Sequence, residues 1–169
     1  MVRNSYPKNP YIRNGKIADL YLSLLRRRWN RLAKVLGLLM GCQITCPIPS
    51  RLFLPHPIGI VVDSTCILSD DVVLLQQVTL GSKYPYGRVA DERVNPTLQQ
   101  GVYVGPGARV LGPITIGEWS VIGANAVITR DVPAYSIAVG HNKILDTKTT
   151  ELELKSVTGE NCDGPDVSG

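Results

Sequence analysis

The amino-acid sequence predicts an all-β fold, a parallel β-helix of hexapeptide repeats, with a short N-terminal helical segment and one extended loop. Aliphatic residues recur at every sixth position through the second half of the chain, and small or branched residues fill the slot four positions after each. The aliphatic set is Leu98, Val104, Val110, Ile116, Ile122 and Ile128. Because a helix repeats about every 3.6 residues and a strand about every two, a period of six is typical of a β-helix.

The same spacing continues toward the N-terminus and predicts where the loop lies. The earlier slots are Cys42, Ile48, Leu54, Ile60, Cys66, Val72 and Val78. From Val78 to Leu98 the step is twenty residues, which the repeat accounts for as one hexapeptide and an insertion of fourteen. The insertion places an extended loop at 81–95. A β-sandwich would instead alternate with a period of two and turn about every 8–12 residues.

Length and composition bound the remaining organisation. A chain of 169 residues is expected to form one domain. We divide it into an N-terminal arm and helix (1–40), a β-helix domain (41–145) and a polar C-terminal tail (146–169). The net charge of +4 is mild and does not by itself indicate nucleic acid.

The cysteines and histidines predict no metal site. Cys42 and Cys66 fall in interior slots of the repeat, which favours buried thiols over a disulfide or a metal. The chain has two histidines and no cluster with zinc-ligand spacing. A reducing, cytoplasmic setting is the expectation that follows.

Residues 16–40 are predicted to be helical, since apolar residues recur there at three and four positions. Arg26, Arg27, Arg28, Arg31 and Lys34 supply a basic face. One interpretation is that the helix caps the open first coil of the solenoid. The other is that it rests on an anionic membrane surface, at the inner face of the membrane.

The repeat also predicts a line of residues along one edge. Three hexapeptides make one triangular coil, so residues eighteen apart stack, about 4.8 Å from one coil to the next. After the predicted insertion is removed, His56, Leu74, Pro106 and Ala124 fall at one corner of successive coils. Three coil steps span about 14 Å. A long, thin ligand could lie along this edge with its reactive end at His56.

His56 is the candidate catalytic residue. It lies in the segment LPHPIG, where prolines on both sides restrict the backbone at a corner. Histidine changes its charge near neutral pH, so it suits the role of a general base. His141 follows the repeats and is assigned no catalytic role.

Two longer stretches carry a resemblance to a known family. LPHPIGIVVDSTCILSDDVVLLQQVTLGSK and NPTLQQGVYVGPGARVLGPITIGEWSVIGANAVITRDVP resemble the hexapeptide-repeat acyltransferases, and most closely their serine O-acetyltransferase branch. The resemblance implies a left-handed β-helix and a homotrimer with an active site between neighbouring subunits. It also implies acetyl-CoA as the donor, lying along the groove, and no metal.

The resemblance assigns roles to particular residues. His56 matches the catalytic histidine, which takes the proton of the acceptor hydroxyl. The backbone around Gly81 and Ser82 matches the contact to the tetrahedral oxyanion, a charge that needs fixed hydrogen-bond donors. The positions that flank the pantetheine arm are matched by Gly105, Pro106, Gly123 and Ala124. Arg130 and Lys143 are candidates for the nucleotide phosphates.

Three departures from the family pattern bear on the acceptor. Serine O-acetyltransferases carry aspartates where Gly41 and Pro55 stand and a histidine where Asn95 stands, and these groups serve the amino-acid substrate. The short colanic acid acetyltransferases are similar to this chain in length and in the N-terminal helix. We therefore expect a sugar hydroxyl in polysaccharide biosynthesis as the acceptor, contacted from the loop. The loop residues available are Tyr84, Tyr86, Arg88, Arg93 and Asn95, of which Arg93 and Asn95 are the assigned substrate contacts.

Serine as the acceptor is the first alternative, and a non-enzymatic β-helix scaffold is the second. A metal-dependent β-helix hydratase needs three converging histidines, and the chain has two.

Overall fold

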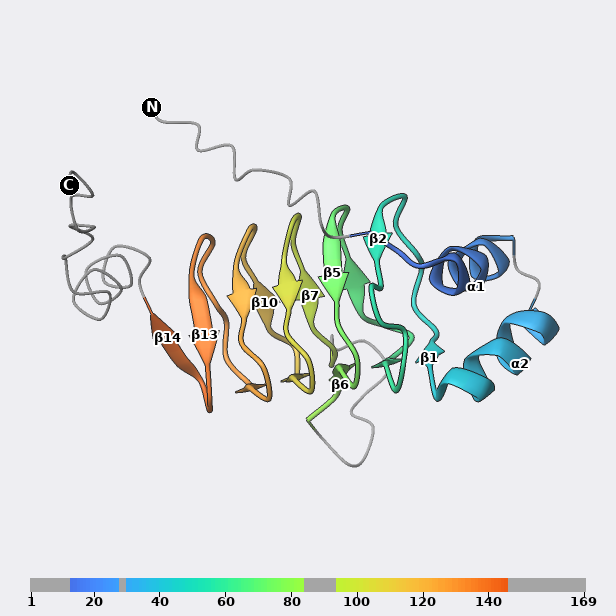
Figure 1. Cartoon of the computed structure of the whole chain (residues 1–169). Coiled ribbons are helices and arrows are strands. Elements are labelled where there is room, and N and C mark those ends of the chain that lie inside the picture. Colours follow the sequence, from blue (N-terminus) through green and yellow to red (C-terminus); the bar gives the residue numbers. More distant parts are fainter. Residues whose placement is uncertain (1–12, 28–29, 84–93, 146–169) are drawn as a thin grey trace, which may run out of the picture.

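The structure, a computed structural model, describes residues 13–27, 30–83 and 94–145. Short strands are stacked coil upon coil along one axis, with two helices at one end and the C-terminal strands at the other (Figure 1). Consecutive coils are joined by parallel pairing, as a solenoid requires, and among the strands of the described ranges only the last is antiparallel. The predicted parallel β-helix is confirmed.

Two helices stand where the sequence predicted one. α1 (Lys16–Arg26) and α2 (Asn30–Met40) pack against each other, and the helix prediction over 16–40 was wrong in its continuity. One helix of 25 residues would be about 37 Å long, whereas two shorter helices can both lie over the end of the narrow coil. Among the described residues no helix is long and apolar enough to cross a membrane.

The helices cover the first coil of the solenoid. Ala18, Tyr21 and Leu22 of α1 and Ala33 of α2 are buried in the same apolar core as Cys42. This packing follows the first of the two interpretations of the helical segment. A hollow of about 940 Å³ remains between the helices and residues 42–48.

The strands form the three faces of a triangular prism. The first face contains β2 (Leu52–Phe53), β5 (Val72–Leu74), β8 (Tyr103–Val104), β11 (Val121–Ile122), β13 (Ile137–Val139) and the antiparallel β14 (Lys143–Leu145). The second contains β1 (Gln43–Ile44), β3 (Val61–Val62), β6 (Thr79–Gly81), β9 (Arg109–Leu111) and β12 (Val127–Ile128). The third contains β4 (Ile67–Leu68), β7 (Thr97–Leu98) and β10 (Thr115–Ile116).

The register of the strands corrects the phase predicted from the sequence. Leu74 pairs with Val104, thirty residues later, so the loop adds twelve residues to the eighteen of a coil and not fourteen. Leu52 pairs with Val72, twenty residues later, so the coil that contains His56 carries two extra residues at its corner. Val72 therefore does not stack on Leu54 and Val104. Instead Leu74 does, and Leu74 is completely buried in the core.

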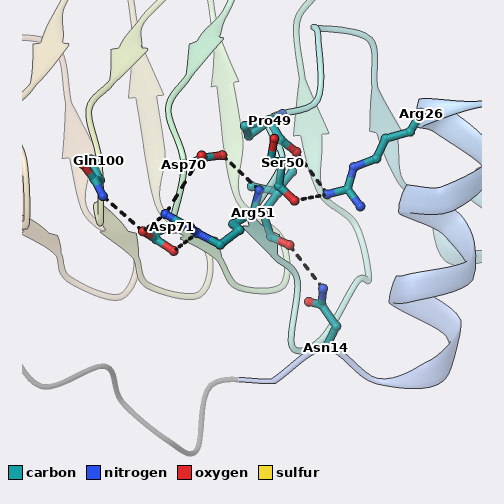
Figure 2. A network of polar contacts seen from close by, with 9 residues as sticks. Asn14, Arg26, Pro49, Ser50, Arg51, Asp70, Asp71 and Gln100 are labelled. Atoms are coloured by element: carbon teal, nitrogen blue, oxygen red, sulfur yellow. Dashed lines mark hydrogen bonds and ion pairs between the residues drawn. The ribbon is translucent and has the colours of Figure 1, made fainter.

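Polar contacts fasten the helical end to the first coil (Figure 2). The Arg26 guanidinium donates to the carbonyl oxygens of Pro49 and Ser50, both at 3.0 Å. On the same segment, Arg51 forms a two-pronged ion pair with Asp71 of the next coil, at 2.7 and 2.8 Å. These contacts hold the segment that leads into β2 and, from there, to His56.

Candidate functional site

One edge of the prism carries the corners that follow β2, β5, β8 and β11, and we call it the histidine edge. Backbone hydrogen bonds fix the order of these corners. Gln77 N donates to Ile58 O at 2.8 Å, Gly107 N to Gln76 O at 2.9 Å, and Asn125 N to Pro106 O at 2.8 Å. Gln76 thus takes the place at the corner that the sequence assigned to Leu74.

His56 lies at this edge, where its coil has a two-residue insertion between β2 and Ile58. Its side chain is exposed, and no described residue forms a hydrogen bond with its imidazole. The backbone on both sides is held instead. Cys42 Sγ donates to Pro57 O at 3.0 Å, and the Asn14 side chain bridges β2, accepting from Leu54 N at 2.6 Å and donating to Leu52 O. A rigid corner therefore presents a solvent-accessible imidazole.

Sequence reasoning missed Asn14 because its partners lie about forty residues away and no local pattern marks the pairing. Gly41 belongs to the same line of corners, since Gly59 N donates to Met40 O at 2.9 Å. An aspartate at position 41, as the family pattern has it, would therefore stand beside the corner of His56.

The small residues expected to flank the donor do lie on the histidine edge. Pro106 is half-buried and Ala124 is exposed, one coil apart. Gly105 is buried, and a Cβ there would meet Ala124 N at 2.8 Å. A Cβ at Gly123 would meet the Val139 side chain at 3.0 Å. The two glycines thus allow close stacking of the coils, whatever else they contact.

Lys143 extends the same line by two strand spacings beyond Ala124. Lys143 is the first residue of β14 and pairs with Val139, the last residue of β13. Val139 in turn lies beside Gly123 in the stack. The Lys143 side chain is exposed. From His56, which follows β2, to Lys143 in β14 the edge runs over five strand spacings, or about 24 Å. An imidazole at one end and a cation at the other suit an extended, anionic ligand.

The other candidate residues lie on a second edge, formed by the corners that follow β3, β6, β9 and β12, which we call the loop edge. Gly81 ends β6 there, Ser82 follows it, and Arg130 follows β12. A Cβ at Gly81 would meet nothing within 4 Å. A six-residue side of the coil is about 20 Å long, so one chain does not bring these residues to His56.

Asn95 also lies on the loop edge but is only 1% exposed. Its Nδ2 donates to Thr65 Oγ1 at 2.7 Å, and its buried Oδ1 has no partner among the described residues. Buried in this way, it is poorly placed to meet an acceptor directly. Arg93, together with Tyr84, Tyr86 and Arg88, lies outside the described residues.

The described cysteines are buried thiols. Burial raises the pKa of Cys66 to about 12 and that of Cys46 to about 11. Both stay protonated near neutral pH, which makes them poor nucleophiles and poor metal ligands. In the described part of the chain, no three His, Cys, Asp or Glu side chains gather in a way that could hold a metal ion.

Comparison with known proteins places the chain. Residues 95–130 match the family described as Bacterial transferase hexapeptide (six repeats). The serine acetyltransferase of Helicobacter pylori is 39% identical over 132 residues, which are 75% of this chain and 75% of that protein. The chain belongs to the serine acetyltransferase family. Its members include the enzyme of Mycobacterium tuberculosis, 45% identical over 93 residues.

Solved structures of the serine acetyltransferase family agree with the fold. The enzyme of Brucella abortus in complex with coenzyme A matches with a TM-score of 0.62 and 31% identity, over 76% of this chain and 52% of that one. The left-handed β-helix expected from the resemblance is thereby confirmed. This chain spans 39% of the M. tuberculosis relative and 44% of the Haemophilus influenzae relative that it matches.

The comparisons overturn the expected acceptor. A sugar hydroxyl was predicted, but the matched proteins are serine acetyltransferases from several bacteria and from soybean. The sequence argument relied on the departures at Gly41, Pro55 and Asn95 and on the short N-terminal segment. Those features concern single positions and length, whereas the identity with the serine acetyltransferase family extends over most of the described solenoid. The expected closeness to capsule enzymes is likewise not what these relatives show.

Proposed function

We propose that this chain transfers the acetyl group of acetyl-CoA to the hydroxyl of serine. The observation that carries the proposal is the histidine edge, where an exposed imidazole on a rigid corner is aligned with Pro106, Ala124 and Lys143. Membership of the serine acetyltransferase family and the coenzyme A complex of a solved relative support acetyl-CoA as the donor.

In the proposed reaction His56 acts as the general base. Its imidazole removes the proton of the acceptor hydroxyl as that oxygen attacks the thioester carbonyl carbon. Backbone N–H groups near Gly81 and Ser82 stabilise the negative charge on the carbonyl oxygen. The tetrahedral intermediate then collapses, so that the C–S bond breaks and the departing CoA sulfur takes the proton from His56.

A homotrimer would bring the two edges together. His56 and the donor positions lie on the histidine edge, whereas Gly81, Ser82 and Arg130 lie on the loop edge. In a closed three-fold ring each subunit uses two different surfaces to contact its neighbours, so the loop edge of one copy can face the histidine edge of the next. Sedimentation at three times the chain mass of 18.4 kDa would support this assembly.

The division of the chain belongs to the same proposal. Residues 41–145 would be the acyltransferase domain, residues 1–40 an N-terminal arm and helical segment, and residues 146–169 a polar C-terminal tail. The tail lies outside the described residues. A cytoplasmic location is proposed with the activity, because acetyl-CoA is its donor.

A thiol-release assay tests the activity. We expect free CoA to form from acetyl-CoA in the presence of L-serine, together with O-acetylserine detected by mass spectrometry. O-methyl-L-serine is the matched control, since it keeps the amino and carboxyl groups but lacks the hydroxyl. No release with serine, or equal release with O-methyl-L-serine, would contradict the proposal.

The donor path can be tested separately with Ala124→Trp. An indole at this exposed corner would fill the histidine edge between Pro106 and Lys143, so we expect the KM for acetyl-CoA to rise by about tenfold or more. Ala134→Trp is the control, because Ala134 is also exposed but precedes β13. It therefore lies on neither the histidine edge nor the loop edge, but on the remaining edge of the prism. An unchanged KM in Ala124→Trp would place the donor elsewhere.

A further inference from the structure

Both helices expose an apolar stripe outside the face that they bury on the first coil. On α1 the exposed fractions are 59% for Ile17 and 54% for Leu20. On α2 they are 53% for Leu32, 57% for Val35 and 79% for Leu39. In each helix the spacing is three or four residues, which gathers the side chains on one face. The helices thus bury one face on the first coil and leave another apolar face uncovered.

Cations border these stripes. Lys16 and Arg27 adjoin Ile17 and Leu20 around the axis of α1, and Arg31 adjoins the stripe of α2; all three are exposed. Residues 13–40 contain seven lysines and arginines and one acid, a net charge of +6. The whole chain carries +4, so the remainder carries a net charge of −2. The positive charge of this protein is therefore concentrated at its helical end.

We propose that this surface docks on an anionic lipid membrane. The helical patch is defined by Ile17, Leu20, Leu32, Val35 and Leu39 with the cations Lys16, Arg27 and Arg31. An apolar face with cations along its border is the composition of helices that lie in the membrane interface, where apolar side chains enter the boundary and cations meet anionic headgroups.

Charge favours the lipid surface over a second copy of the chain as the occupant. Two patches facing each other would oppose two regions of net charge +6, and like charges at close range repel. Anionic headgroups are attracted instead. A helix of eleven residues is about 16 Å long, which is too short to cross a hydrocarbon core of about 30 Å. Each helix would therefore lie along the interface.

The position of the patch is compatible with a working acetyl-transfer site. The helices lie at one end of the strand stack (Figure 1), whereas the histidine edge runs along its side. Contact through the end would leave the side of the prism open to soluble ligands. The docking proposal depends neither on the acceptor nor on the three-fold assembly.

Vesicle co-sedimentation of the full chain tests the proposal. We expect binding to phosphatidylcholine vesicles that contain about one third phosphatidylserine, little binding to pure phosphatidylcholine, and weaker binding as salt is raised. The Lys16→Glu/Arg31→Glu double variant should bind at least about tenfold more weakly. Leu32→Ser/Leu39→Ser should also lose binding, and since both leucines are exposed, its circular dichroism spectrum should match that of the wild type.

The matched control is Arg130→Glu/Lys143→Glu, which makes the same change in net charge far from the helices and should still bind. Equal binding to neutral vesicles, no binding of the wild type, or equal loss in the control would overturn the proposal. So would a lipid-free self-association that Leu32→Ser/Leu39→Ser abolishes, because a second copy would then occupy the patch. The vesicle experiment does not measure acetyl transfer, so a failure of the proposed acetyltransferase activity would be a separate result.

Discussion

We expect His56→Ala to lower kcat by about 10²–10⁴, the range that general-base catalysis usually contributes. The KM for acetyl-CoA and the thermal unfolding temperature should stay near their wild-type values. The imidazole is exposed and no described residue hydrogen-bonds to it, so its removal breaks no hydrogen bond within the described residues. Steady-state thiol release and a thermal melt measure the two quantities.

The chain provides its own control in His141, the other histidine. It is exposed and follows β13, and no step of the proposed reaction uses it. His141→Ala should keep kcat within about twofold, because an exposed side chain without a role in the reaction can be removed at little cost to the fold. A His56→Ala enzyme with near-wild-type kcat would remove the assigned base, whatever the acceptor proved to be.

The sequence predicted the fold and the edge of His56 correctly, although it misjudged the phase. The loop was counted as fourteen extra residues where the register gives twelve, and the two extra residues beside His56 were not seen. Because these errors are equal and opposite, Leu54, Val104 and Ile122 still fall on one face.

The error has a physical cause. In this prism the slot two residues before each aliphatic position also points inward, as the buried Val72 and Val102 show. Side chains alternate along a strand, so a shift by two keeps every residue on the same side. Hydrophobic pattern alone therefore cannot detect it, and only the pairing of one coil with the next can.

The sequence did not predict that the candidate site is divided between two edges, and the reason is a different one. Spacing along the chain showed which residues share a corner, but Gly81, Ser82 and Arg130 were assigned by resemblance, without a corner. The clamp that Asn14 forms on β2 was equally hidden, since it joins an irregular segment to a distant strand. Both features depend on tertiary packing.

Gly105→Ala should destabilise the fold by about 3 kcal/mol, which lowers the Tm of a chain of this size by roughly 6–12 °C. The new Cβ would lie 2.8 Å from Ala124 N and 2.9 Å from Gly123 C and Ile122 O, all backbone atoms of the next coil. A side chain could rotate away from the methyl group, but the backbone is held by the hydrogen bond from Gly105 N to Ile122 O at 2.8 Å. The coils must separate locally, and calorimetry at fixed protein concentration measures the cost.

Gly81→Ala is the matched variant for this comparison. Gly81 also belongs to the repeats, but a Cβ there meets nothing within 4 Å, so stability should change by less than about 0.5 kcal/mol. Equal destabilisation by both substitutions would mean that glycine matters through backbone freedom and not through coil contact. If only Gly105→Ala destabilises, the glycine is required for the close stacking that sets the separation of Pro106 and Ala124, and with it the shape of the proposed donor path.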